Sequence, residues 1–397
     1  MNLKPPFSAA NLAPERQVGL LIRVAALAIA ASFLLSWKLW VTSRLFPLIP
    51  ISDQLPAIPY PFDYVWFLTL LALLAAISAF SRPHKLIFVF LSLAVALSLW
   101  DQMRWQPWFY QYLSILAVVG LFAGWRKPET ARNQAALDAC RLIVASTYVW
   151  TGVQKLNVTF VRETWPDMAS FLPGFWQSIV KQVPPFAILL IPLVEILIGV
   201  GLLTIRFRKR AVLLATATHG AILMLLVLTG ENVVVWPWNV AMLLFVWILF
   251  WQDKQTTARR IVVGKKAFHW LVLLLFGVLP AFSFFGLWDS YLSSSIYSGS
   301  TYQAAIYLTP AVMARLPPDI HPHIWQSSQP FFLDVNRWAY AELRVPINPE
   351  PRVFRRVARR ICQYANGVPK ISLWIRQKPN LLTGSYESEY YDCESLE

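Results

Sequence analysis

The chain has 397 residues, of which 57% are hydrophobic and only 14% are charged. Soluble domains carry about 25% charged residues, so this composition excludes an ordinary soluble protein and predicts an all-α, multi-pass helix bundle embedded in a lipid bilayer. The net charge of +14 does not indicate nucleic-acid binding, because the basic residues gather in short loops between apolar segments.

Nine apolar segments have about the length that a membrane-spanning helix needs, which is roughly 20 residues. They cover residues 18–37, 63–80, 86–103, 107–125, 137–157, 185–205, 211–230, 233–251 and 267–287. The third and fourth are joined so closely that a single re-entrant hairpin also fits them. Pro237 and Pro280 interrupt the last two, so neighbouring groups must satisfy the backbone there.

The N-terminal residues 1–17 are polar and show no clear cleavage site, which predicts that the first apolar segment is retained as a span. We therefore expect a transmembrane bundle over residues 18–287 and a separate C-terminal region over residues 288–397.

Basic residues alternate between successive loops. Lys and Arg are frequent in residues 81–85, 125–132, 206–210 and 253–266, and sparse in residues 42–62, 158–184 and 230–236. Basic loops remain in the cytoplasm, so this alternation places the N-terminus inside. With an odd number of spans, residues 288–397 lie outside the membrane, in the periplasm if the membrane is a bacterial inner membrane.

The C-terminal region is predicted to be a small α+β tail. A helix begins near Pro351 and stops at Asn366–Gly367, and residues 370–378 then alternate like a strand. The helix carries one basic face, which suits either anionic lipid headgroups or solvent, and its members are Arg355, Arg356, Arg359 and Arg360.

The positions of the cysteines and histidines add three expectations. Cys362 and Cys393 both lie in the exported tail, where a disulfide between them is chemically permitted, although the spacing does not show that they meet. Cys140 lies within an apolar segment, as a small core residue does. Asp319, His321 and His323 form a group of only three candidate ligands, so no metal site is predicted.

Lys155 is the first candidate for chemistry, because polar groups within a bilayer are costly and mark functional sites. It lies in the stretch YVWTGVQKLN, about 28 Å along the helix from the inner side at 1.5 Å per residue. Two interpretations stay open. The lysine extends its ammonium to the outer headgroups, or apolar surroundings keep it uncharged and able to act as a base.

Two further ionisable residues lie in the middle of predicted spans. Glu195 has no charged residue within a helical turn and must be paired or protonated, with Lys155 or Arg141 as candidate partners. His219 suits either a buried hydrogen-bonding role or a catalytic one. We take Lys155, His219 and Glu195 as the candidate catalytic residues.

Polar and aromatic residues also gather at the outer ends of several spans, which is the pattern of a pocket that opens to the outside. Asp101 and Arg104 have the spacing of a helical ion pair. The candidate pocket residues are Asp101, Arg104, Gln106, Trp108, Tyr110, Tyr148, Glu231, Trp238 and Asn239.

These motifs carry a family resemblance over about residues 18–300. The order of YVWTGVQKLN, VEILIGVGLL and THGAILML resembles the membrane domain of vitamin K-dependent γ-carboxylases, the HTTM domain, and the broader group of DoxX-like membrane proteins. The resemblance implies nine spans, an inner N-terminus and an outer C-terminus. It also implies that Lys155 is the base that deprotonates a vitamin K hydroquinone-like quinol and that His219 matches an intramembrane histidine.

The chain departs from the carboxylase pattern in two places. Pro107 and Trp108 stand where the family carries Asn-His, and the tail of about 110 residues is much shorter than the family's luminal region. Carboxylation of protein glutamates is therefore not expected.

Two functional hypotheses follow. One is a membrane enzyme that acts on a quinol or a similar lipid-soluble small molecule. The other is a non-catalytic DoxX-like membrane subunit or scaffold whose tail binds a periplasmic protein partner.

Overall fold

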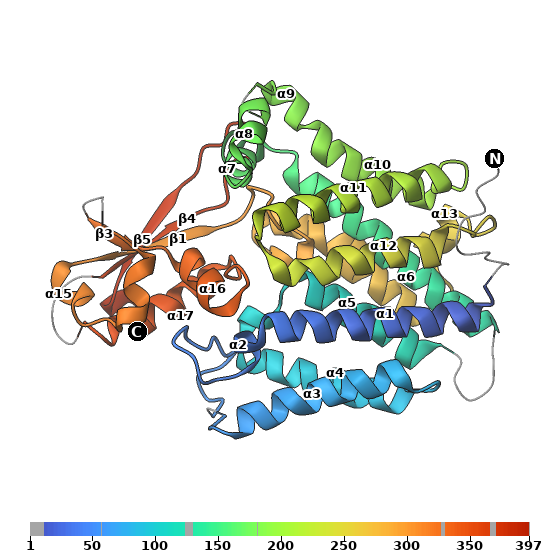
Figure 1. The fold of residues 1–397 in the computed structure, drawn as a ribbon, viewed down its shortest axis with the longest axis horizontal. Helices are drawn as coiled ribbons and strands as arrows, with labels where there is room; N and C mark the ends of the chain where they lie inside the picture. Colours follow the sequence, from blue (N-terminus) through green and yellow to red (C-terminus); the bar gives the residue numbers. More distant parts are fainter. Residues whose placement is uncertain are drawn as a thin grey trace.

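Long helices run side by side along the bundle, and a small sheet lies at one end of it (Figure 1). The computed structural model describes residues 12–56, 58–123, 130–180, 182–326, 330–365 and 371–396. The helix α1 (Pro14–Leu35) begins at the end of the bundle opposite the sheet (Figure 1).

Each of the nine predicted apolar segments forms helix within the described ranges. These helices are α1 (Pro14–Leu35), α3 (Phe62–Ala79), α4 (His84–Trp100), α5 (Pro107–Ala117), α6 (Thr130–Lys155), α10 (Leu190–Leu203), α11 (Arg208–Thr229), α12 (Trp236–Phe250) and α14 (Ala267–Val272). Turns of π-helix extend α5 over Val118–Phe122 and α14 over Leu273–Val278, and a 3-10 segment continues the latter over Leu279–Phe285.

In the described residues, six helical segments are both long and apolar enough to cross a membrane. They are Pro14–Leu35, Phe62–Ala79, Pro185–Leu203, Arg208–Thr229, Val233–Phe250 and Ala267–Phe285. The helices α4 and α5 are apolar but shorter. The remaining helix, α6, has 26 residues and carries polar side chains along much of its length.

Pro237 and Pro280 lie at the starts of helical segments, where a missing N–H removes no hydrogen bond within the segment. Pro237 lies in the first turn of α12, where its missing N–H has no intrahelical acceptor. Pro280 lies at the start of the 3-10 segment, and its carbonyl accepts a hydrogen bond from the Gln154 side chain at 3.4 Å.

Short helices lie between the long ones. They are α2 (Trp37–Trp40), α7 (Trp165–Ser170), α8 (Gly174–Val180) and α13 (Ala258–Val262). The short helix α9 (Pro185–Ile188) begins the apolar segment Pro185–Leu203, which α10 continues. The helices α7 and α8 lie at the end of the bundle nearest the sheet, whereas α13 lies at the opposite end (Figure 1). The tail and the loop over residues 158–184 are therefore on one side, and the basic loop over residues 253–266 is on the other.

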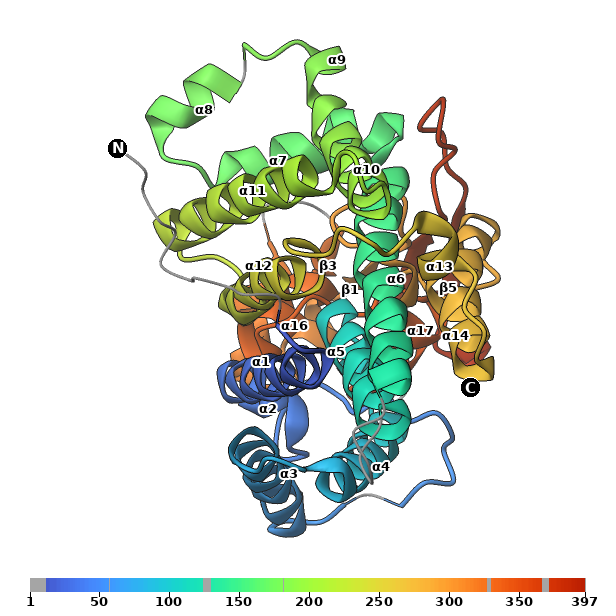
Figure 2. The ribbon, with the colours of Figure 1, turned by 90° about the vertical axis from the view of Figure 1, so that its right-hand side faces the viewer.

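Close packing of α6 against α10 forms the centre of one half of the bundle (Figure 2). A Cβ atom on Gly152 would lie 2.5 Å from the Pro192 carbonyl oxygen, and one on Gly199 would lie 2.8 Å from the Ala145 carbonyl oxygen. Small residues at such crossings let helix backbones approach within a membrane. This contact brings side chains of α10 directly against the C-terminal half of α6.

The tail is an antiparallel five-stranded sheet with short helices, as expected of a small α+β unit. The strand order is β2-β3-β1-β4-β5. The elements are β1 (Gln303–Leu308), α15 (Pro310–Met313), β2 (Ile324–Trp325), β3 (Phe331–Leu333), α16 (Val335–Leu343), α17 (Pro351–Cys362), β4 (Ser372–Arg376) and β5 (Ser388–Asp392).

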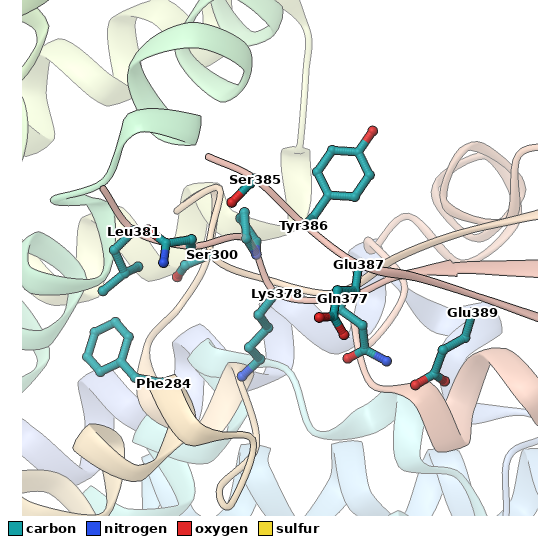
Figure 3. Close-up of a pocket in the computed structure, with 11 residues that line it drawn as sticks. Phe284, Ser300, Gln377, Lys378, Leu381, Ser385, Tyr386, Glu387 and Glu389 are labelled. Carbon is teal, nitrogen blue, oxygen red and sulfur yellow. The ribbon is translucent and has the colours of Figure 1, made fainter. Parts of the chain in front are cut away.

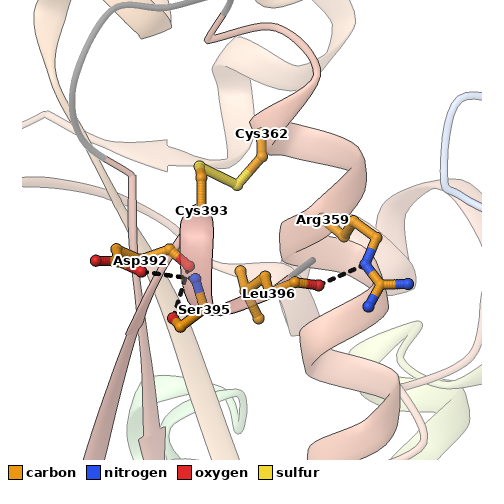
Figure 4. Close-up of a disulfide and its surroundings, with 6 residues drawn as sticks. All are labelled: Arg359, Cys362, Asp392, Cys393, Ser395 and Leu396. Carbon is orange, nitrogen blue, oxygen red and sulfur yellow. Dashed lines mark hydrogen bonds between the residues drawn. A yellow bond between two sulfur atoms is a disulfide. The ribbon is translucent and has the colours of Figure 1, made fainter.

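The helix α17 begins at Pro351 as predicted and ends at Cys362, while Asn366–Gly367 lie outside the described residues. A disulfide joins Cys362 to Cys393 and ties the end of this helix to the segment after β5 (Figure 4). The Arg359 Nε atom donates to the Leu396 carbonyl at 2.6 Å in the same region. The disulfide that the sequence left open is therefore present.

The basic face of α17 lies against other parts of the protein. Arg356 forms an ion pair with Asp53 of the loop between α2 and α3, and Arg359 lies 3.6 Å from the same carboxylate. Arg355 approaches Glu389 of β5 at 3.8 Å. The sequence alone suggested that this face meets lipid headgroups or solvent. In the structure, Asp53 and Glu389, which are distant in sequence, provide acidic partners for it.

The packing at Gly152 generates a stability prediction. Gly152→Leu places a side chain where the α10 backbone lies, so we expect it to cost about 3 kcal/mol or more and to lower the thermal unfolding midpoint in detergent. Gly220→Leu is the matched control, because nothing lies within 4 Å of a Cβ atom there. Equal midpoints for the two variants would contradict the close α6–α10 contact.

Candidate functional site

A buried ion pair joins the end of α6 to α10. The Lys155 Nζ atom lies 2.7 Å and 2.8 Å from the two Glu195 carboxylate oxygens. The side chains are only 11% and 14% exposed. Apolar surroundings strengthen such a pair, because little water competes for the charges. Of the two partners that the sequence suggested for Glu195, Lys155 is the one that meets it.

A second polar chain links α6, α11 and α12. The Tyr148 hydroxyl lies 2.6 Å from Nε2 of His219, and Nδ1 of His219 lies 2.7 Å from Oδ1 of Asn239. The Asn239 amide nitrogen donates to the Val235 carbonyl, so its oxygen is the atom that faces His219. This arrangement suits a neutral histidine that donates from Nδ1 and accepts the tyrosine proton at Nε2.

The two polar groups share one face of α6. Tyr148 and Lys155 are seven residues apart, which is about two helical turns or roughly 10 Å along the axis. Tyr148 also lies within electrostatic range of Glu195. Of the predicted candidates, Lys155, Glu195, His219, Tyr148 and Asn239 therefore belong to one region.

A third set of contacts surrounds α6 on another side. The side-chain Nε2 atom of Gln111 donates to the Thr147 hydroxyl at 2.9 Å. The Trp238 indole nitrogen donates to the side-chain Oε1 atom of Gln111 at 2.7 Å. Trp238 was predicted as a pocket residue, whereas Gln111 and Thr147 were not selected. Their signal in the sequence was only a polar side chain in an apolar segment.

The C-terminal end of α6 forms hydrogen bonds with the segment that leads into the tail. The Gln154 amide nitrogen donates to the Ser283 hydroxyl at 2.7 Å, and the Asn157 amide nitrogen donates to the Ser298 carbonyl at 2.8 Å. The backbone nitrogen of Val158 donates to the Leu381 carbonyl at 3.0 Å. The tail thus covers the end of α6 just beyond Lys155.

Asp101 pairs with a different arginine from the one its spacing suggested. Its carboxylate lies 2.5 Å from the Arg44 guanidinium, and both side chains are fully buried. The Arg104 guanidinium donates instead to the carbonyls of Leu39, Leu97 and Trp40, at the ends of α2 and α4. Arg104 caps these helix ends because their last carbonyls have no intrahelical donors.

The other predicted pocket residues have separate surroundings. The Gln106 amide donates to the carbonyls of Met103 and Pro346, and Trp108 packs in a buried aromatic cluster that includes Phe33. The Tyr110 ring stacks on Phe276 at 4.8 Å. Glu231 is exposed at the end of α11. These positions do not share the contacts of the Lys155 region, and a substrate-binding role for them stays a prediction.

Charged side chains form another network at the opposite end of the bundle. Arg141 lies 2.6 Å from Asp138 and 3.1 Å from Asp253, and Arg208 lies 3.4 Å from Asp253. Arg141 is only 2% exposed. Arg141 thus pairs with two acidic residues inside the protein, and neither of them is Glu195.

A cavity of about 800 Å³ lies where the tail meets the bundle (Figure 3). Its lining comes from Phe284, Ser300 and the β4–β5 connection over residues 377–389. None of the predicted pocket residues lines it. Sequence reasoning missed this cavity because the connection has no recognisable motif and meets the bundle only in the folded chain.

Within the described ranges, no group of three or more His, Cys, Asp or Glu side chains is arranged to hold a metal ion. His321 instead lies 3.2 Å from the Leu316 carbonyl through its Nε2 atom.

Comparisons with known proteins identify no relative. No family model, curated protein or solved structure matches this chain.

The Lys155–Glu195 pair generates a prediction about stability. Lys155→Met or Glu195→Leu alone leaves one buried charge without its partner, so we expect each to cost about 3–5 kcal/mol. The double variant removes both charges and should recover most of that loss. Unfolding in detergent measures it, with the exposed Lys254→Met as the control, and additive losses in the double variant would contradict the coupling.

Proposed function

We propose that the chain is a nine-span integral protein of a bacterial inner membrane, with residues 1–17 in the cytoplasm and residues 288–397 in the periplasm. Support comes from the apolar helices, from the basic loops opposite the tail, and from the disulfide of Cys362 with Cys393. The helices α4 and α5 are shorter, and each of them counts as one span in this proposal.

The proposed activity is deprotonation of a lipid-soluble quinol, of the vitamin K hydroquinone type, at Lys155 and Glu195. The observation that carries it is the ion pair itself, because a buried carboxylate and ammonium in contact provide a proton acceptor and a cation at one point. The resemblance to the HTTM domain suggested the substrate class. The rest of the proposal depends on the contacts of these residues.

The contacts assign different roles to the two residues. An ammonium that donates to Glu195 has no lone pair, so Lys155 is not the direct base while the pair is closed. A quinol hydroxyl that enters the pair transfers its proton to the Glu195 carboxylate. The products are a neutral Glu195 and a quinolate anion, which the Lys155 ammonium stabilises.

Tyr148, His219 and Asn239 support this site from two turns further along α6. Asn239 orients the His219 ring, and the ring holds the Tyr148 hydroxyl on the face that also carries Lys155. A hydrogen-bonding group fixed in this way can orient the second oxygen of a quinol. These three residues are positioning residues in the proposal.

The non-catalytic alternative has an observation of its own. The polar side chains of α6 are bonded to neighbouring helices and to the tail, as they are in a helix whose polar groups only hold a bundle together. In that case the protein is a DoxX-like subunit or scaffold, and its exported tail binds a periplasmic partner.

The quinol proposal predicts co-purification. Mass spectrometry of lipids extracted from the purified chain should find a quinone, and Glu195→Gln should lower its amount by about tenfold, because a charge-assisted hydrogen bond contributes about 1.5–3 kcal/mol. The reversed pair Lys155→Glu with Glu195→Lys is the control for folding. Absence of quinone from the unaltered protein, or equal amounts in the Glu195→Gln protein, would favour the scaffold.

The topology generates a separate prediction. Alkaline phosphatase fused after residue 396 should be active, and a green fluorescent protein inserted in the loop over residues 206–210 should fluoresce, because the first reporter needs export and the second needs the cytoplasm. An inactive phosphatase at the C-terminus would show an even number of spans and would contradict the proposed topology.

A further inference from the structure

The cavity at the junction of tail and bundle has charges of opposite sign at its two ends. Lys378 lies toward the end that carries Phe284, whereas Glu387 and Glu389 lie toward the other end (Figure 3). The candidate site at Lys155 and Glu195 contributes no residue to this lining. The cavity is therefore a second site.

Lys378 retains donors for a ligand. Its ammonium donates to the Ser283 carbonyl at 2.6 Å and lies 5.1 Å from the centre of the Tyr302 ring. An ammonium has three N–H donors, and the contacts with described residues account for one hydrogen bond. Burial lowers the pKa of Lys378 despite the carboxylates of Glu350 and Asp289, so an anion at this point would stabilise the charged form.

The carboxylates of Asp289 and Glu350, which lie near Lys378, also pair with an arginine. Arg352 lies 2.7 Å from Asp289 and 3.7 Å from Glu350. Lys378 and Arg352 together balance the charges of Asp289 and Glu350, so what Lys378 offers a ligand is its remaining N–H donors rather than an excess of positive charge.

The acidic end also has capacity for a ligand. The Glu387 side chain forms no ion pair or hydrogen bond with the part of the chain that the structure describes. The Glu389 carboxylate bonds with the Tyr391 hydroxyl and lies 3.8 Å from Arg355. Glu387 is therefore the residue that can pair with a cation in the cavity.

Exposed apolar side chains adjoin the cavity in sequence. Phe285, Leu287 and Leu382 are 76%, 71% and 86% exposed. Phe285 is the last residue of the final apolar helical segment, and Leu287 lies two residues beyond it. Apolar groups at the end of a span lie near the boundary between acyl chains and headgroups. The polar cavity then lies at the level of the headgroups.

We propose that this cavity binds the headgroup of an ethanolamine phospholipid from the outer leaflet, with the phosphate at Lys378 and the primary ammonium at Glu387. A purely anionic headgroup is disfavoured by the two glutamates in the lining, and a purely cationic ligand is disfavoured by the lysine. A choline headgroup has the same charges but no N–H donor for a carboxylate.

Native mass spectrometry of the delipidated full-length protein tests the assignment. We expect phosphatidylethanolamine to bind at least about fivefold more tightly than phosphatidylcholine or phosphatidylglycerol of the same acyl chains. Glu387→Gln should remove the preference for ethanolamine over choline, because it removes the acceptor of the ammonium. Lys378→Gln should weaken the binding of both zwitterionic lipids.

Glu394→Gln is the matched control, since Glu394 is exposed in the tail and does not line the cavity. Glu387→Gln keeps the test informative if Lys378→Gln does not fold. Equal binding of the three lipids, an unchanged preference in Glu387→Gln, or equally tight binding of soluble glycerophosphoethanolamine would overturn the proposal. These readouts do not involve quinone, so they are independent of the function proposed for Lys155 and Glu195.

Discussion

The polar face of α6 is the constraint on which the arrangement of the bundle depends. A helix inside an apolar bundle has no water to satisfy its polar side chains, so each of them needs a partner on a neighbouring helix. Glu195 of α10 pairs with Lys155, and His219 of α11 bonds with Tyr148. Gln111 of α5 bonds with Thr147. Three helices are thereby held in register around one.

Two glycines allow α6 and α10 to come close enough for the Lys155–Glu195 ion pair to form. Gly152 and Gly199 bring the backbones of α6 and α10 together, so that a lysine near the end of one helix reaches a glutamate in the middle of the other. A larger residue at either position would separate the two charges and leave each without its partner. The ion pair therefore depends on the close packing of the two helices.

The tail is joined to the bundle by contacts from several directions. Lys378 bonds with the end of the last apolar segment, and Glu163, in the loop after α6, pairs with Arg376 of β4 at 2.7 Å. Glu342 of α16 accepts hydrogen bonds from the backbone of Leu45 and Phe46. The tail is thus held to the bundle at the last apolar segment, at the loop after α6 and at the loop after α2.

The sequence by itself determined the positions of the apolar helices, the small α+β tail and the choice of Lys155, Glu195 and His219 as candidates. Hydrophobicity, periodicity and charged residues within apolar segments are local properties, which a sequence shows directly. Only the tertiary structure decided the partners. Asp101 has the spacing to pair with Arg104 but pairs with Arg44, 57 positions away in the sequence. The Arg104 guanidinium instead donates to the Leu97 carbonyl near the end of α4, where carbonyl groups lack intrahelical donors. The cavity at Lys378 likewise forms from segments that meet only when the tail packs on the bundle, a contact that no local pattern encodes.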